Sequence, residues 1–260
     1  GVPICQGMRM AGKTRLTKGK IVSAPEGALA PVPFPLATWA GGRRRIPSQA
    51  RSLRTRALIL EAAKDLANSK GVGSVTMQMV AAKAKIAAGT AYQFFDDRDA
   101  IFYDLYETWA GAWWSSVVRS TSRPWSAANW ADEIDAVVEN GCKFHLKQKE
   151  MWEVIRYVES TKVGREGMKL LFDANVERCI QWMSPYLKSV GMSAAEIRSL
   201  AISILRTARG HHMYGPIDST SLREVIRGSQ EAQRAIVEMK LRAVGKKGGS
   251  SSAVVRSKSV

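Results

Sequence analysis

The stretch AAGTAYQFFDDRDAIF, residues 87–102, decides the fold. It places Gly89 and Thr90 at the front of a predicted helix and then sets Tyr92, Gln93 and Phe94 in a row. A helix that only packs repeats its apolar residues every three or four positions and keeps polar residues on the opposite face. This segment does not follow that pattern, so it predicts a helix whose front contacts something outside the protein.

The residues before this stretch predict two further helices. Apolar residues recur at helical spacing and end at the turn SKGVGS, residues 69–74; they are Leu53, Ala57, Leu60, Ala63 and Leu66. Thr76 then offers an N-cap hydroxyl to a short helix, MQMVAAKA, and KIAA, residues 85–88, is long enough only for a bend. Two short helices joined by such a turn form a helix-turn-helix, whose second helix lies in the major groove of DNA.

The second helix of this unit carries side chains suited to DNA. Small residues at its front let the backbone approach phosphates, hydroxyl groups can donate to phosphate oxygens, and an amide can reach a base edge. The residues concerned are Ala88, Gly89, Thr90, Tyr92 and Gln93. The alternative is that Tyr92 and Phe94 pack in a small helical core and that Gly89 is a kink. The combination of residues and helix lengths favours DNA binding.

At this point the chain resembles a known family. Residues 51–106 are similar to the N-terminal domain of the TetR family of transcriptional repressors. The shared features are a leading Arg with the ILEAA helix, a GxxxxT turn from Gly71 to Thr76, and the GTAYQFF segment followed by a basic residue at Arg98. The resemblance implies an all-α protein, with an N-terminal three-helix DNA-binding domain and a C-terminal helical domain for ligand binding and dimerisation.

The resemblance also implies a set of DNA-binding residues. Thr76 and Gln78 would start the first helix of the unit against the DNA, and Arg98 would take the place of a phosphate-binding lysine. The full predicted set is Arg43, Arg44, Arg45, Thr76, Gln78, Lys85, Ala88, Gly89, Thr90, Tyr92, Gln93 and Arg98. Two positions depart from the family. Lys85 stands where the turn usually has a glycine, and Ala87 stands where a helix cap is common, so a strained turn and a weaker helix start are expected.

The net charge of +16 is confined to the two ends of the chain. Residues 1–56 carry eleven lysines and arginines against one acid, and residues 240–260 carry six against none, so the middle is neutral. Basic arms flanking a neutral body are expected of proteins that approach nucleic acid. The alternative is that these tails only serve solubility.

Composition sets the expected domain limits. The proline-rich residues 23–42 lack periodicity and the C-terminus has a Gly/Ser composition, so both tails are predicted to be disordered. We expect a basic arm over 1–47, a DNA-binding domain over 48–98, a helical domain over 99–243 and a basic tail over 244–260. A secretory signal is disfavoured because prolines interrupt the apolar run. Three widely spaced cysteines and no apolar run of membrane-spanning length indicate a cytoplasmic protein.

The C-terminal part predicts six helices. Phe102, Tyr106, Trp109 and Trp113 form one aromatic stripe on the first of them, and Pro124 follows its end. Later helices are expected at about 127–147, 149–163, 166–189, 194–213 and 221–243. Ser193 with Glu196, and Ser221 with Glu224, are predicted capping boxes for the last two.

The last two helices each present an apolar face. The first face holds Ile197, Leu200, Ala201, Ile204, Leu205 and Ala208, and the second holds Leu222, Val225, Ile226, Ile236, Val237 and Leu241. In the family the corresponding helices form a four-helix dimer interface. The sequence leaves two alternatives open, because the same faces could instead close the core of one chain.

The aromatic residues suggest a ligand site. Eight tryptophans could line a pocket for an apolar or aromatic effector, with Tyr106, Trp109, Trp113 and Trp152 as candidates. The alternative is that they are core residues. Neighbouring His211 and His212 point to different sides of a helix, so no metal site is expected. No GxSxG, HExxH or GxGxxG motif occurs. We therefore expect a DNA-binding regulator without catalytic residues or cofactor; an all-helical binding protein or enzyme is the alternative.

Overall fold

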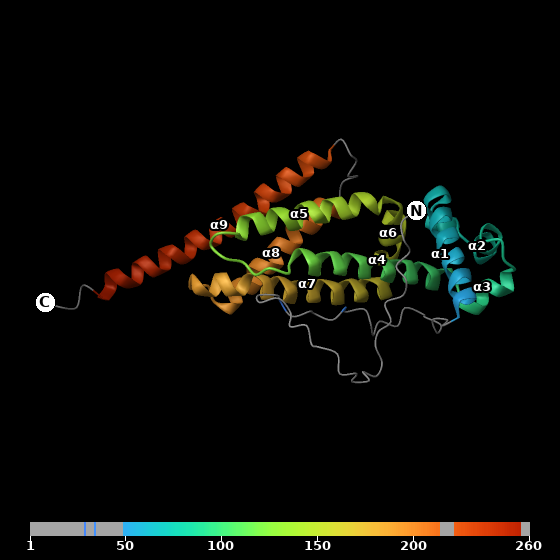
Figure 1. The fold of residues 1–260 in the computed structure, drawn as a ribbon, viewed down its shortest axis with the longest axis horizontal. Coiled ribbons are helices and arrows are strands. Elements are labelled where there is room, and N and C mark those ends of the chain that lie inside the picture. The colour runs from blue at the N-terminus through green and yellow to red at the C-terminus, as the bar shows by residue number, and fades with distance from the viewer. Residues whose placement is uncertain (1–28, 30–33, 35–48, 214–220, 256–260) are drawn as a thin grey trace, which may run out of the picture.

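The described part of the chain is helical throughout, as the sequence predicted. A computed structural model describes Leu29, Phe34 and residues 49–213 and 221–255. A small unit of three helices lies at one end and an elongated bundle of longer helices extends from it (Figure 1). The helices are α1 (Ala50–Lys70), α2 (Met77–Lys83), α3 (Ala88–Phe94), α4 (Arg98–Ser120), α5 (Trp130–Lys147), α6 (Trp152–Ser160), α7 (Lys162–Ser189), α8 (Ala194–Met213) and α9 (Leu222–Val255), with 3-10 turns η2 (Val72–Ser74) and η3 (Lys149–Met151).

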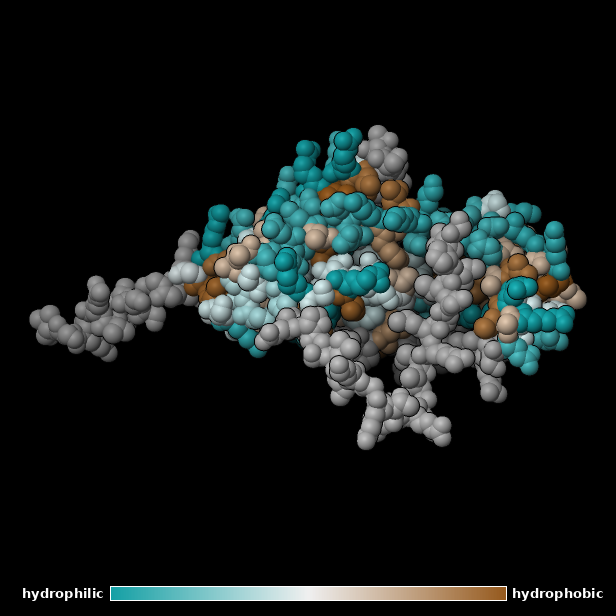
Figure 2. Space-filling view, viewed as in Figure 1, coloured by the Kyte–Doolittle hydropathy of each residue, from teal (hydrophilic) through white to brown (hydrophobic). Residues whose placement is uncertain are grey.

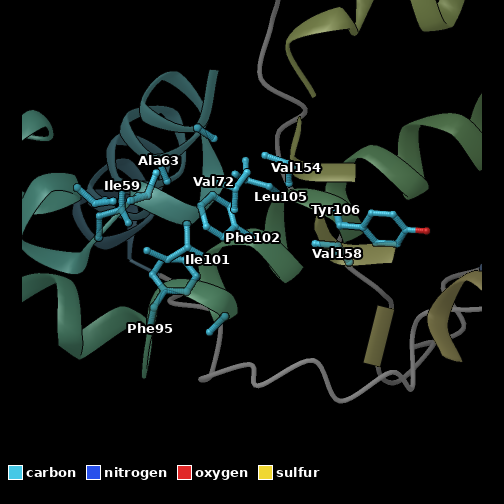
Figure 3. Close-up of a cluster of buried hydrophobic side chains, with 14 of the residues drawn as sticks. Ile59, Ala63, Val72, Phe95, Ile101, Phe102, Leu105, Tyr106, Val154 and Val158 are labelled. Carbon is cyan, nitrogen blue, oxygen red and sulfur yellow. The ribbon is translucent and has the colours of Figure 1, made fainter. Parts of the chain in front are cut away.

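Helix α1 packs through a face that overlaps the predicted one at Ala63 and Leu66 but is centred on other residues. The core side of α1 consists of Ile59, Ala62, Ala63, Leu66 and Ala67, whereas Leu53 is 43% exposed. The run ALILEAA holds apolar residues at consecutive positions, so periodicity alone could not decide between Ile59 and Leu60. Because Ile59 is fully buried, it fixes the face that packs against the rest of the unit (Figure 3).

Helix α4 joins the two parts of the molecule. Its buried residues Ile101, Phe102 and Leu105 share one hydrophobic cluster with α1 and with Val154 of α6 (Figure 3). Across the same junction, Arg56 of α1 forms an ion pair with Asp104. The expected domain boundary between residues 98 and 99 therefore falls at the start of α4, and the side chains of α4 pack against both the three-helix unit and the bundle.

A buried arginine holds the other end of α4. Arg178 of α7 is 1% exposed. Its Nε donates to Thr121 Oγ1 at 2.8 Å, and its Nη2 donates to the carbonyl oxygens of Thr121 at 2.9 Å and Val118 at 3.3 Å. The last carbonyl groups of a helix lack partners within the helix, so a cation placed there satisfies them. Burial lowers the pKa of Arg178.

The C-terminal bundle has its own core. A second cluster joins α5, α7, α8 and α9 around Trp125, Trp182 and Met183. Ile197, Leu200, Ala201 and Ile204 of α8 and Val237 of α9 are buried in it. These residues belong to the two apolar faces for which the sequence left two alternatives open, and here α8 and α9 use them to pack within one chain. Leu205, Val225, Ile226, Ile236 and Leu241 are only half buried.

Local signals set the starts of several helices. Thr161 caps α7 by accepting a hydrogen bond from the Gly164 N–H at 3.0 Å. The Ser193 capping box is confirmed, because Ser193 N–H donates to Glu196 Oε2 at 2.9 Å and Glu196 N–H donates to Ser193 Oγ at 3.3 Å. At Gly164 the backbone of α7 meets α6 so closely that an added Cβ would lie 1.8 Å from the Val158 carbonyl oxygen. This contact requires glycine.

The two terminal segments differ from the predicted disorder where they are described. Leu29 N–H donates to the Ser122 carbonyl at 3.4 Å, and Phe34 packs beside Gly111 of α4. Burial of these apolar side chains on the bundle offsets the entropy lost on ordering them. Helix α9 continues to Val255, past the predicted end at 243. Adding a residue to an existing helix costs less than nucleating one, and no proline follows to stop it.

No helix within the described ranges is long and apolar enough to cross a bilayer. Cys142 and Cys179 are buried, and neither forms a disulfide. Burial raises the pKa of Cys142 to about 11 and that of Cys179 to about 12, so both stay protonated at neutral pH. Cys5 lies outside the described residues.

Candidate nucleic-acid interface

The predicted helix-turn-helix forms with the expected lengths. Helix α2 begins after Thr76, whose Oγ1 accepts a hydrogen bond from Met79 N–H at 3.2 Å, and α3 follows after a short turn. Phe95 is buried at the end of α3, where the Arg56 guanidinium lies 5.8 Å from its ring centroid. Phe94 is half buried against the hydrophobic cluster that includes Ile59 and Phe102, so it is a packing residue.

The structure places most of the predicted DNA-binding residues on the outer surface. The exposed members are Thr76, Gln78, Lys85, Ala88, Gly89, Tyr92 and Gln93. Thr90 is half buried, while Tyr92 is 41% exposed although it is aromatic. At this end of the molecule hydrophilic and hydrophobic residues lie side by side on the surface (Figure 2). Arg43, Arg44 and Arg45 lie outside the described residues.

The turn between α2 and α3 is strained at the predicted position. Lys85 has φ = 56°, and among the described residues it is the one non-glycine with positive φ. This left-handed conformation costs an L-residue with a Cβ roughly 1–2 kcal/mol. Ala87 precedes α3 without any side-chain cap. Both departures from the usual turn are therefore real, and neither prevents the helices from forming.

Gly89 faces open space. A Cβ added at Gly89 would meet no atom within 4 Å. Packing inside the chain therefore does not require glycine here, in contrast to Gly164. A glycine in a helix also costs about 0.5–1 kcal/mol relative to alanine. A molecule that approaches the α3 backbone from outside would account for its presence.

The helix-turn-helix segment, from Thr76 to Phe95, carries basic side chains and no acidic ones. From Thr76 to Phe95 the charged residues are Lys83 and Lys85. Lys83 forms an ion pair with Asp65 of α1 at 3.1 Å, whereas Lys85 is exposed and has no ion pair within the described part of the chain. Lys85 is therefore the lysine of the unit that is available to a phosphate group.

Arg98 has partners that the sequence did not predict. Its Nη1 donates to the carbonyl oxygens of Val72 at 3.1 Å, Gly73 at 3.0 Å and Val75 at 3.2 Å. Its guanidinium also lies 5.7 Å from the centroid of the Tyr157 ring. The Val72 carbonyl also accepts a hydrogen bond from Val75 N–H at 3.2 Å, and Arg98 adds a donor to all three carbonyl groups around η2. This geometry gives Arg98 contacts inside the domain, and its phosphate contact stays a prediction.

The predicted ligand residues gather around a histidine. Trp109, Trp113 and Trp152 lie 6.1, 4.9 and 5.5 Å from His145, measured between ring centroids, and Trp152 stacks on it. Tyr106 lies 5.5 Å from Trp109. Tyr106, Trp109 and His145 are buried. The sequence analysis did not predict His145 because a lone histidine within a helical pattern gives no signal of its neighbours.

Taken together, these features define a helix-turn-helix DNA-binding protein with a C-terminal helical bundle. Residues 59–105 match the family described as bacterial regulatory proteins, tetR family. They therefore carry the N-terminal domain of the TetR family, and the resemblance found in the sequence is confirmed. A comparison with curated proteins gives no match.

Solved structures share the fold over most of the chain. One is described as a TetR-family transcriptional regulator from Syntrophomonas wolfei: it is 18% identical, with 70% of this chain and 94% of that chain covered and a TM-score of 0.56. A second, from Mesorhizobium loti, is 16% identical, with 74% of this chain and 98% of that chain covered and a TM-score of 0.56. A complex of SmeT with triclosan is 18% identical and covers 73% and 91%, with a TM-score of 0.54. At these identities the likeness shows the fold.

Proposed function

We propose that this protein is a repressor that binds a palindromic operator as a homodimer and is released by a small-molecule effector. The observation that carries the proposal is the exposed surface of α3, where Gly89, Tyr92 and Gln93 are exposed and the space beside Gly89 is open. In this proposal residues 48–98 bind DNA, residues 99–243 bind the effector and the second subunit, and the basic tails approach the backbone.

The roles of the surface residues follow from their chemistry. Gln93 is the candidate for a base edge, because an amide can both donate and accept there. Thr76, Lys85 and Tyr92 are candidates for phosphate contacts, which fix position without reading sequence. Arg98 is a further candidate for a phosphate contact, although its Nη1 is bonded to carbonyl groups inside the domain.

Half-buried apolar residues on α8 and α9 support the dimer. Leu205, Val225 and Ile226 remain partly exposed after the chain has closed its own core. Met239 of α9 is 60% exposed. A second copy packed against these helices would cover them, and its two-fold axis would place two α3 helices about one DNA turn apart.

Selection from random duplex DNA tests the proposal. The full-length protein should enrich a palindrome whose half-sites lie about 10 base pairs apart, at about physiological salt. Gln93→Ala should relax the preference at one position of each half-site, while Lys85→Ala should weaken binding to all sequences similarly. Failure of the folded protein to enrich any sequence would overturn the proposal.

The alternative function is that of an all-helical binding protein or enzyme with unspecific basic tails. It predicts weak DNA binding without sequence preference, lost when the tails are trimmed. Residues 7–14, GMRMAGKT, do match the GxxxxGK[ST] spacing of phosphate-binding loops. That motif requires a strand before it and a helix after it, and these residues lie outside the described part of the chain. The spacing alone is a weak signal for an enzyme.

A further inference from the structure

Four helices of the C-terminal part bring polar side chains together beside the aromatic cluster. Glu159 of α6 accepts a hydrogen bond through Oε2 from Arg209 Nη2 of α8 at 3.0 Å. The other terminal nitrogen of Arg209 contacts the sulfur of Met168 on α7. The hydroxyl of Tyr106 on α4 points away from the cluster of Ile59 and Phe102 (Figure 3). Its pKa is raised, first by burial and then by the charge of Glu159.

Two polar atoms at this place are buried without a partner. Glu159 Oε1 and Trp109 Nε1 are inaccessible to solvent and have no hydrogen-bond partner within the described residues. Trp109 is 7% exposed and its ring centroid lies 5.5 Å from that of Tyr106. The charge of Glu159 also raises the pKa of Tyr106, so Tyr106 neighbours both residues. Buried polar atoms normally have partners, so an unpaired acceptor and an unpaired donor here call for an explanation.

A purely structural ion pair does not explain this geometry well. An arginine that neutralises a carboxylate frequently binds both carboxylate oxygens with two nitrogens. Here one nitrogen of Arg209 binds one oxygen of Glu159, and the other contacts a thioether, which is a weak acceptor. The pair therefore balances the charge of Glu159 but leaves Oε1 available as an acceptor.

We propose that Glu159 Oε1 and Trp109 N–H recognise a neutral aromatic molecule that carries a hydroxyl or N–H donor. This inference rests on the proposed function, because it names the chemical class of the effector. A ligand cation would add charge to a pair that Arg209 already neutralises, and a ligand anion would face the carboxylate of Glu159. The neighbouring rings of Tyr106 and Trp109 supply an aromatic wall for the body of the molecule.

Calorimetric titration of the full-length protein with three probes of one shape tests the proposal. The probes are 2-naphthol, which carries a donor, 2-methoxynaphthalene, which lacks it, and 2-naphthoate, which is an anion. We expect one 2-naphthol per chain, bound at least about tenfold more tightly than the ether, since a hydrogen bond to a carboxylate is among the stronger ones. Equal binding of 2-naphthol and the ether, tightest binding of 2-naphthoate, or binding of none would overturn the proposal.

Variants at Glu159 and Trp109 test whether 2-naphthol binds at these two residues. Glu159→Gln should weaken 2-naphthol about tenfold and leave the ether unchanged. Glu153→Gln, an exposed carboxylate on the same helix, is the matched control and should change neither. Trp109→Phe removes the N–H but keeps an aromatic ring and should also weaken 2-naphthol. Unchanged affinity in folded Glu159→Gln and Trp109→Phe proteins, checked by thermal unfolding, would overturn the assignment.

The DNA selection is a separate readout of the proposed function. A protein that enriches a palindrome but does not prefer 2-naphthol contradicts the inference alone. A protein that prefers 2-naphthol through Glu159 but enriches no DNA supports the binding site and contradicts the regulator.

Discussion

The N-terminal three-helix unit and the C-terminal bundle keep their polar side chains in opposite places. Within the described residues the buried side chains of α1, α2 and α3 are all apolar. The buried polar or charged residues lie in the rest of the chain; they are Asp104, Thr121, Glu133, His145, Asn175, Arg178, Ser229 and Gln233. The unit at the end of the molecule thus presents its polar chemistry outward, and the bundle encloses its own.

The difference has a physical reason. A unit that binds a macromolecule needs a rigid apolar core beneath a polar surface, because its partner stays outside. A bundle that binds a small molecule has to keep polar groups inside, where few waters compete with the ligand. Such groups lower stability if they are left unpaired. Single substitutions can therefore distinguish the two regions. Those in the bundle should mainly change the free energy of unfolding, and those on the surface of the three-helix unit should mainly change DNA binding.

The largest expected effect is in the bundle, at a glycine that packing requires. Gly164→Ala should lower the free energy of unfolding by about 3 kcal/mol, since the new Cβ would overlap the Val158 carbonyl. Gly228→Ala on α9 is the matched control, because a Cβ there meets no atom within 4 Å. Denaturant unfolding of both variants measures the difference. Similar stabilities would show that α6 and α7 can separate at little cost.

The next effect concerns a glycine at the surface. Gly89→Ala should leave the stability unchanged or raise it by about 0.5–1 kcal/mol, because its Cβ enters open space. It should nevertheless weaken operator binding about tenfold if DNA approaches the α3 backbone. Gly73→Ala, with equally open surroundings in η2, is the control. Unchanged DNA affinity in Gly89→Ala would exclude a close approach at this point.

A smaller effect is expected at the strained turn. Lys85→Gly should raise the free energy of unfolding by about 0.5–1 kcal/mol, because glycine accepts the positive φ. It should also reduce the salt dependence of DNA binding by about one phosphate contact. Lys85→Ala separates the two effects, since it removes the charge but keeps the Cβ. A salt dependence equal to that of the wild type in both variants would exclude a phosphate contact by Lys85.

The smallest effect is one of pH on the interior of the bundle. Burial raises the pKa of Glu159 in the folded protein, and Arg209 only partly opposes this. A raised folded pKa stabilises the protein at low pH, and this stabilisation is lost as pH rises through that pKa. The wild type should therefore gain stability relative to Glu159→Gln between about pH 7 and about pH 5. Denaturant unfolding at both pH values checks the sign, with Glu153→Gln as the control.

Sequence reasoning succeeded where one local signal decides the outcome. The Thr76 cap, the Ser193 capping box and the turn at Lys85 each depend on residues close in the chain. It was wrong or silent where several packings satisfy the same pattern. The place of Ile59 at the centre of the buried face of α1 is one example. The packing of the apolar face of α8 within one chain is another, since the sequence left that alternative open.

The candidate sites show the same division. The exposed residues of α3 could be predicted, because their pattern breaks the rule for a packed helix. The contacts of Arg98 with Val72, Gly73 and Val75 could not, since the side chain satisfies carbonyl groups that carry no sequence signature. Glu159 and Arg209 lie 50 residues apart in the chain, and only the packing of α6 beside α8 brings them together.

Arginine side chains hold α4 in place at both of its ends. Arg98 fixes the first turn to the carbonyl groups around η2, and Arg178 fixes the last turn to α7. The 23 residues of α4 span about 35 Å. A tilt of about 5° at the α7 end of such a helix would move its other end, at the helix-turn-helix, by about 3 Å. In a symmetric dimer, the displacements at the two α4 helices would add up in the distance between the two α3 helices.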